Sequence, residues 1–313
     1  VSKAAAMSRA GAPPAPAAAE SKAADGPTLL RHLQSVEPEV QRFKQDAGQK
    51  AFRSETKKVL NLRFGQVSAT QRSMRDCLQA LTDLLDRQLA GSDASRRRFV
   101  EFAFAERIAD EAEVGIMSQP RSAWSKARVA ARIFAKSPEI WTLFQGFVFR
   151  ACPFSMPDFS GAQVGRQGPL PGQRAAESFT QVSDRMVAYH RLWLTVLVIQ
   201  GNLGVIWRWL AKTLNEREAS SISAPLLVAT LEAAGADAQA RYGRQFAKLV
   251  DAMGQHYLPQ LQELLSRIKG EESDQVMASE SRLRRWIESF RRSGRAPVSI
   301  GREVEVDEEQ PIR

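Results

Sequence analysis

Apolar side chains recur at helical spacing along most of this chain of 313 residues. Between 68 and 89, six of them fall on one side of a single helix and charged residues take the other positions; the six are Met74, Cys77, Leu78, Leu81, Leu84 and Leu85. The same spacing predicts charged helical segments between 28 and 60 and helices at 96–118, 124–136, 138–150, 177–198, 204–215, 224–234, 237–253, 255–268 and 279–292. No stretch keeps the two-residue alternation of a strand for long. The pattern predicts an all-α protein, a helical scaffold of antiparallel helices joined by turns.

Composition divides the chain into three parts. Residues 1–26 are rich in alanine, proline and serine, and such a segment buries too little apolar surface to offset its ordering entropy, so we expect a disordered leader. Residues 27–295 form the expected helical domain. Residues 296–313 form an expected flexible, acidic tail. Within the domain, 160–173 holds four glycines and two prolines and is predicted to be a surface loop.

The charge of the chain indicates which classes of partner it can bind. Hydrophobic residues make up 43% of it, which suits a folded core, and the net charge is +9 with a pI of about 9.9. Residues 302–313 carry two basic and five acidic residues, so the remainder is more basic still. Such a body favours polyanions or acidic protein faces. The longest apolar run, 192–206, is broken by polar and glycine residues, so no membrane insertion is expected.

The sequence offers few side chains arranged for catalysis, metal binding or nucleotide binding. His32, His190 and His256 lack the spacing of metal ligands, and Cys77 and Cys152 lie far apart without a CxxC pattern. Neither a GxxxxGK[ST] loop nor a GxGxxG loop occurs. The carboxylates of the helix at 96–118 read as a solvated face with ion pairs along the helix. The sequence therefore predicts a protein that is not an enzyme and that acts through what its surface binds.

An ordered series of short motifs gives a resemblance. The series comprises Arg63-Phe64-Gly65-Gln66, Ala105-Glu106-Arg107, Arg150-Ala151-Cys152-Pro153-Phe154, Trp207-Arg208-Trp209-Leu210-Ala211, Leu214-Asn215, the helix at 226–235, Tyr242-Gly243-Arg244-Gln245-Phe246 and Tyr257-Leu258-Pro259. In this order, over about 55–292, the motifs resemble the C-terminal domain of the GLFG-lethal mRNA export mediators of the nuclear pore. Each motif alone is weak, and their order and spacing make the resemblance specific.

The resemblance implies a helical domain of HEAT or MIF4G type that docks on a DEAD-box RNA helicase of mRNA export and stimulates its ATPase. In many members, inositol hexakisphosphate lies between the two proteins. It implies a place at the cytoplasmic face of the nuclear pore complex, within a protein found in nucleus and cytoplasm. Further implied partners are nucleoporins and translation initiation or termination factors.

Three arginines match basic positions of the family. Arg63, Arg107 and Arg150 are expected to converge on one surface, where they would bind inositol phosphate and the helicase. Ala151 takes the second place of a basic pair, and Glu111 stands where some members carry a basic residue. Losing two contacts of about 1.5 kcal/mol each would weaken the affinity for inositol hexakisphosphate roughly a hundredfold. On the helix at 124–136, Arg128 and Arg132 either compensate or form a solvated face.

Other features leave alternatives open. Trp207 and Trp209 point different ways on a helix, so we expect one in the core and the other at an edge; a base-stacking platform is the alternative. Arg241, Arg244 and Lys248 form a basic stripe along one helix. This stripe either faces a partner or is the solvent-exposed face of its helix. Two further functions fit the charge: a MIF4G-like translation or RNA-decay scaffold that binds RNA directly, and a structural adaptor. Binding of RNA without any helicase would separate the scaffold from the helicase activator, since the scaffold should bind with a steep salt dependence and the activator weakly.

Overall fold

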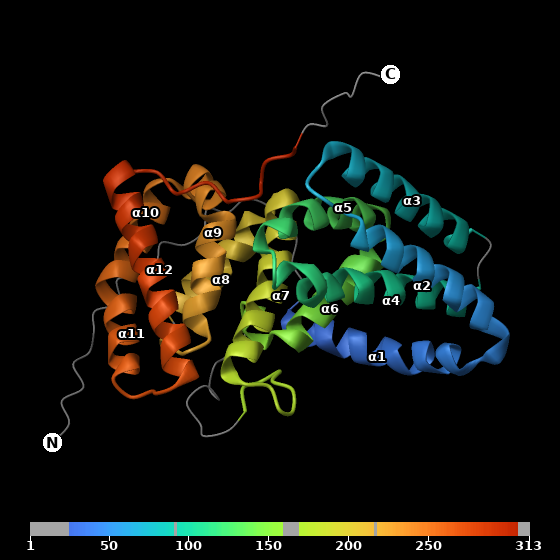
Figure 1. The fold of residues 1–313 in the computed structure, drawn as a ribbon, viewed down its shortest axis with the longest axis horizontal. Helices are drawn as coiled ribbons and strands as arrows, with labels where there is room; N and C mark the ends of the chain where they lie inside the picture. The colour runs from blue at the N-terminus through green and yellow to red at the C-terminus, as the bar shows by residue number, and fades with distance from the viewer. Residues whose placement is uncertain (1–24, 91–92, 159–168, 216–217, 306–313) are drawn as a thin grey trace.

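The computed structural model describes residues 25–90, 93–158, 169–215 and 218–305, and these form helices joined by short turns. The helices of the described residues are α1 (Gly26–Gln45), α2 (Lys50–Gly65), α3 (Gln71–Leu89), α4 (Ala94–Glu111), α5 (Ala123–Lys136), α6 (Pro138–Ala151), α7 (Phe179–Ile199), α8 (Leu203–Asn215), α9 (Ser223–Tyr242), α10 (Arg244–Ala252), α11 (Leu258–Leu265) and α12 (Glu271–Ser293) (Figure 1). The prediction of an all-α fold is confirmed.

Several helix ends follow from local sequence. Pro138 opens α6, where its missing N–H needs no partner. Ser178 and Gln181 form a capping box at the start of α7, each side chain accepting a bond from the other residue's backbone N–H. Gly294 ends α12 in the left-handed conformation, with φ of 67°. These ends are readable without the tertiary structure.

One expected break is absent. The sequence predicts separate helices at 224–234 and 237–253, divided near Gly235, but α9 runs unbroken to Tyr242 and stops at Gly243, where φ is 48°. A Cβ on Gly235 would lie 2.8 Å from the ring of Trp286 on α12. Gly235 therefore lets α12 approach α9 closely, and it does not end the helix.

Two helices continue through π turns. The predicted helix at 96–118 is α4 followed by the π turn η2 (Ala112–Ile116). The π turn η5 (Met253–Tyr257) joins α10 to α11, where the sequence predicts an interruption near 254. Such turns insert an extra residue into a helix and re-aim the side chains that follow. In this protein η2 begins directly after Glu111, one of the positions that bear on the candidate site.

The long helix α7 lies in the middle of the molecule and connects its two halves (Figure 1). It packs on α5 and α6 of the first half and on α9 and α12 of the second. Fourteen of its residues are buried, and ten of these, including Trp193, belong to a hydrophobic core that continues into both halves. Trp207 and Trp209 of α8 are both buried in that core, so neither packs at an edge and neither is free to stack on a base.

Residues 296–305, here named the strap, leave α12 and lie against the rest of the protein (Figure 1). The Ala296 N–H donates to Gln239 Oε1 at 2.7 Å, and the indole N–H of Trp124 donates to Ser299 Oγ at 2.9 Å. Arg302 forms two hydrogen bonds with Asp237 of α9, at 2.6 and 2.9 Å. The sequence predicts flexibility from 296 onward, whereas the packed chain continues to 305. The leader through residue 24 and the acidic residues 306–313 lie outside the described residues.

Across the described ranges, no helix combines the length and the apolar character needed to cross a membrane.

Candidate functional site

Arg107 lies over the buried ring of Phe64, and Arg63 is the residue before Phe64, near the end of α2. The guanidinium carbon of Arg107 lies 5.9 Å from the centre of that ring, and the Arg107 side chain is only 12% exposed. Arg63 is half-buried and donates from Nη1 to Gln66 Oε1 at 3.2 Å. Arg63 Nε and Arg107 Nη1 are buried and have no hydrogen-bond partner among the described residues. These two atoms are unused donors at a cationic position.

Glu111 is the buried counterion of this position. Its carboxylate forms ion pairs with Arg107 on its own helix and with Lys126 of α5, and the residue is almost fully buried. The Lys126 ammonium also donates to the carbonyl oxygen of Phe64 at 3.3 Å. Two buried cations thus share one carboxylate, which leaves one net positive charge. Glu111 stands where some family members carry a basic residue. In this protein its carboxylate instead neutralises basic neighbours inside the fold.

Lys126 is a residue that the sequence analysis missed. It lies on the same helix as Arg128 and Arg132, which the sequence singled out, but it is Lys126 that reaches the cluster. Arg128 instead donates to the backbone carbonyl of Arg302 in the strap, and Arg132 is exposed. A lysine among small and apolar residues was the available signal, since such a lysine is buried only where a partner meets it.

Arg150 belongs to a different set of contacts. In the last turn of α6 it forms an ion pair with Glu37 of α1, and its guanidinium lies 5.0 Å from the ring centre of Phe147. Its side chain is 49% exposed. No contact among the described residues joins it to Arg63 or Arg107. The structure thus places Arg107 over the ring of Phe64, next to Arg63 in the chain, and places Arg150 with α1 and α6.

The two sets are connected through α4. Phe147 packs edge-on against Phe102, with 5.1 Å between ring centres, and the Lys44 ammonium lies 5.0 Å from the centre of the Phe102 ring. Lys44 also lies 3.5 Å from Glu106, the residue before Arg107. Arg107 lies over Phe64 of α2, whereas Phe102 contacts α1 and α6 and Glu106 contacts α1.

The corner after Arg150 is braced by Arg185 of α7, which is 3% exposed. Arg185 donates to both carboxylate oxygens of Glu177 at 2.7 Å, to the Ala151 carbonyl at 3.1 Å and to the Gly172 carbonyl at 2.9 Å. Its hydrogen bond is the main reason that the pKa of Glu177 is lowered. Gly172 has φ of 83°, and a Cβ there would lie 2.9 Å from Pro153 Cδ. The loop 169–178 is therefore fixed against the end of α6.

A second anchor holds the same loop to η2. Arg174 donates to the two carboxylate oxygens of Glu113 at 2.7 and 2.5 Å, and the hydroxyl of Tyr189 donates to Glu113 at 2.8 Å. The Arg174 hydrogen bonds lower the pKa of Glu113, while burial and the Glu113 contact raise the pKa of Tyr189. Nearby, burial and the carboxylate of Glu106 raise the pKa of Asp110. Sequence reasoning treated Glu113 as part of a solvated face and missed this anchor.

The buried titratable groups elsewhere have structural partners. His190 lies between Ser155 Oγ at 3.0 Å and Thr230 Oγ1 at 2.9 Å, and its ring packs against Trp209 with 4.6 Å between centres. Burial raises the pKa of the Cys152 thiol to about 11, which keeps it protonated at neutral pH. In the described part of the chain, no group of three or more His, Cys, Asp or Glu side chains is placed to hold a metal ion.

Comparison with known proteins gives the same family across most of the chain. The family model described as GLE1-like protein matches residues 31–254. The mRNA export factor GLE1 of Mus musculus is 27% identical over 222 residues, which cover 65% of this chain and 31% of the relative. The zebrafish (Danio rerio) mRNA export factor GLE1 is 24% identical over 243 residues, covering 68% and 35%. The chain thus spans about a third of the length of these curated relatives.

Solved structures agree on the fold. A chain in the structure of the S. cerevisiae Dbp5 C-terminal domain bound to Gle1 and IP6 superimposes with a TM-score of 0.69. The superposition covers 88% of this chain and 98% of that one, at 18% identity. A second structure of this S. cerevisiae complex gives a TM-score of 0.71 at 17% identity, covering 90% and 99%. Likeness at this identity establishes a shared fold, and since the family model also spans most of the sequence, this chain belongs to the GLE1-like family.

Proposed function

We propose that this domain activates the ATPase of a DEAD-box RNA helicase in mRNA export and has no enzymatic activity of its own. Family membership over residues 31–254 carries the proposal. The matched relatives are mRNA export factors, and the fold is that of a chain solved together with the C-terminal domain of Dbp5. Because the chain spans about a third of the relatives, the proposal concerns what this domain does by itself.

A rigid docking surface is the physical means of activation. A scaffold that binds one arrangement of the helicase lobes more tightly than another shifts the helicase toward that arrangement, by as much as the two affinities differ. The surface must hold its shape for the difference to be expressed. The fixed corner at the end of α6, with Arg185 buried beneath it, supplies that rigidity next to Arg150.

We propose Arg150 as the exposed basic contact of this interface, with Arg63 and Arg107 as a second basic position that lies deeper and apart from it. The fit to inositol hexakisphosphate is partial. Arg107 is mostly buried and already paired with Glu111, and Arg150 is paired with Glu37. Ala151 adds no charge. Arg63 Nε and Arg107 Nη1 have no hydrogen-bond partner among the described residues, but both atoms are buried, so an anion would reach them only after these side chains move. We therefore expect inositol hexakisphosphate to strengthen docking less than it does in a relative that carries the full basic set.

The test is the RNA-stimulated ATPase of the cognate helicase, with and without the domain and over a range of inositol hexakisphosphate concentrations. We expect no ATP hydrolysis by the domain alone, stimulation of the helicase, and a modest further effect of the anion. If the domain leaves the helicase rate unchanged at every anion concentration, the activator function is wrong.

Arg150→Glu tests the interface. The side chain is half exposed, so solvent screens its charge, and reversal should weaken docking by about 1 kcal/mol, roughly a fivefold rise in the concentration for half-maximal stimulation. Arg244→Glu is the matched control, because Arg244 is an exposed arginine of α10, which lies in the other half of the protein (Figure 1). Equal effects of the two substitutions would exclude a specific role for Arg150.

We further propose that the protein works at the nuclear pore complex, on its cytoplasmic face, and that nucleoporins and translation initiation or termination factors are further partners. We propose residues 27–305 as the folding unit, which extends the expected domain by the strap. Proximity labelling from the full-length protein tests the location: recovery of cytoplasmic-face nucleoporins supports it, and recovery of nuclear-interior proteins alone excludes it.

A further inference from the structure

A basic hollow lies where α1 ends and α2 begins. Its volume is about 330 Å³, and its lining consists of Lys44, Lys50, Arg53, Ser54 and Lys57. Four of these five side chains are cations. None of the arginines assigned to the candidate docking site lines it.

Two of the cations are held in place by the fold. Arg53 donates from Nη1 to the carbonyl oxygens of Phe43 and Asp46, so its remaining donors are directed while its full charge is kept. Lys44 is fixed by the ring of Phe102, 5.0 Å away, and by the carboxylate of Glu106 at 3.5 Å. These contacts give the hollow a preorganised basic wall, which reduces the ordering entropy lost on binding.

The other two lining cations, Lys50 and Lys57, have no counterion among the residues that the structure describes. Lys50 and Lys57 are exposed, and none of the ion pairs formed among the described residues includes either of them. Glu106 is the one carboxylate paired with a lining residue in the described part of the chain. The hollow therefore keeps an excess of positive charge at neutral pH, and a concave surface concentrates that potential on an incoming anion.

The arrangement of the cations favours an extended anion. Lys50, Arg53 and Lys57 follow one face of α2 at i, i+3 and i+7, a row about 10 Å long at 1.5 Å per residue. Lys58 extends the basic surface on the exposed side of the same helix. The phosphates of a nucleic acid strand are roughly 3.4 Å apart along a helix axis and further apart in an extended strand. Two or three consecutive phosphates therefore span the length of this row of cations. A compact anion would contact part of the row only.

We propose that this hollow binds the phosphate backbone of a single-stranded nucleic acid, RNA being the natural source. A flexible strand can bend a phosphate and its sugar into a concave site, whereas the phosphates of a duplex are fixed on a convex surface. The proposal goes beyond helicase activation, because it gives the domain its own RNA contact.

The lining also sets the specificity. No aromatic side chain lines the hollow, and the nearby ring of Phe52 is half-buried, with the guanidinium of Arg96 5.1 Å from its centre. Without a ring for bases to stack on, recognition is restricted to charge. Binding is therefore independent of base sequence, is similar for RNA and DNA strands, and weakens steeply as salt is added.

The experiment measures fluorescence anisotropy of labelled 12-nucleotide single strands with the domain, from 25 to 200 mM salt and without any helicase. Three phosphate contacts give a log–log salt slope of about −2 for a single strand. In the double variant Lys50→Gln/Lys57→Gln the slope should fall to about −0.7, with at least tenfold weaker binding at low salt. Neither lysine has a side-chain partner among the described residues, so the variant should unfold at the wild-type temperature, which circular dichroism checks.

The matched control is Arg244→Gln/Lys248→Gln, which removes the same charge from two exposed residues of α10. We expect it to bind RNA like the wild type. Equal losses in the two double variants would overturn the proposal, because binding would then depend on net charge alone. Absence of RNA binding at 25 mM salt would also overturn it. So would tighter binding of a duplex than of a single strand, or inositol hexakisphosphate binding that depends on Lys50 and Lys57 while RNA binding does not.

Discussion

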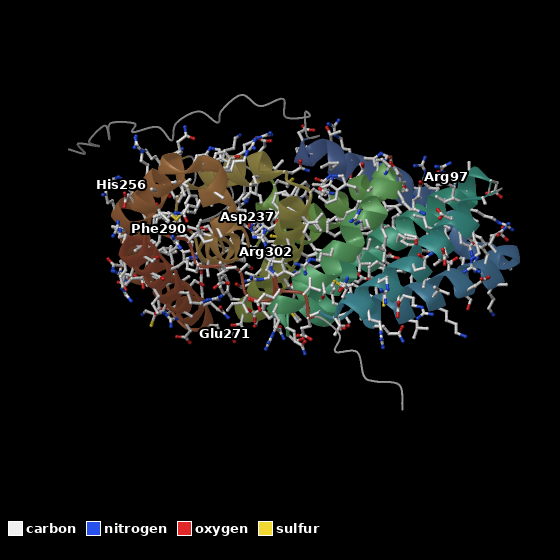
Figure 2. The ribbon with its side chains drawn as sticks, turned by 90° about the horizontal axis from the view of Figure 1, so that it is seen from above. Arg97, Asp237, His256, Glu271, Phe290 and Arg302 are labelled. Carbon is white, nitrogen blue, oxygen red and sulfur yellow. The ribbon has the colours of Figure 1, made fainter. Side chains whose placement is uncertain are left out.

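Replacing Arg302 with alanine should release the strap from the body of the protein. Figure 2 shows Arg302 beside Asp237, to which it donates two hydrogen bonds at 2.6 and 2.9 Å, and its guanidinium lies 5.1 Å from the ring centre of Trp124. The ion pair links the strap to α9, while Trp124 belongs to α5. A single side chain thus connects the C-terminal segment to both halves of the fold.

The free energy lost in Arg302→Ala can be worked out from these contacts. The Arg302 and Asp237 side chains are 38% and 20% exposed, so solvent screens the pair and it is worth about 1 kcal/mol. The contact with the indole adds about 0.5–1 kcal/mol. We expect Arg302→Ala to destabilise the strap by about 2 kcal/mol, and a double-mutant cycle with Asp237→Ala to give a coupling energy near 1 kcal/mol.

Amide hydrogen exchange at Gln71 is the sensitive assay. Gln71 opens α3, so its N–H has no acceptor within the helix, and it donates instead to the carbonyl of Glu305 in the strap at 3.1 Å. A loss of 2 kcal/mol in the strap should speed exchange at this amide about thirtyfold while leaving the core amides of α7 unchanged.

Arg267→Ala is the control, since Arg267 forms an i,i+4 pair with Glu263 in which both side chains are about two-thirds exposed. That substitution should cost a few tenths of a kcal/mol at most and should not alter Gln71. Unchanged exchange at Gln71 in Arg302→Ala would refute the reasoning, because it would mean that the strap is held without its ion pair.

Two further substitutions test the buried charges. Glu111→Gln leaves two buried cations without their carboxylate and should lower the free energy of unfolding by about 3 kcal/mol in urea titrations; wild-type stability would contradict the assignment of Glu111 as counterion. Glu113 has its pKa lowered mainly by Arg174, so its ionised form stabilises the fold above its unfolded pKa of about 4.3, and this contribution is lost as pH falls through the lower folded value. Glu113→Gln should therefore lose stability at pH 7 and show a smaller drop in melting temperature between pH 7 and pH 3.5, a comparison in which equal drops would contradict the prediction.

The sequence by itself determined the class of fold and many helix ends. Amphipathic spacing of 3.6 residues is a local property, so it survives in any tertiary arrangement and marks the helices directly. Pro138 acts within one turn of backbone, and the helix predicted to begin at 138 does begin there. The order of short motifs fixed the family for the same reason, since motif order is a property of the chain.

Only the tertiary structure decided what the charged and glycine positions do. The sequence predicted a break in the helix near Gly235, but the glycine is there because Trp286 of another helix approaches it closely. Glu111 looked like a lost basic contact, but Lys126 of a different helix makes it a buried counterion. Arg150 forms an ion pair with Glu37, 113 residues away in the chain, and so lies apart from Arg63 and Arg107. Ion pairs and close approaches depend on which helices pack together, and spacing along the chain does not contain that information.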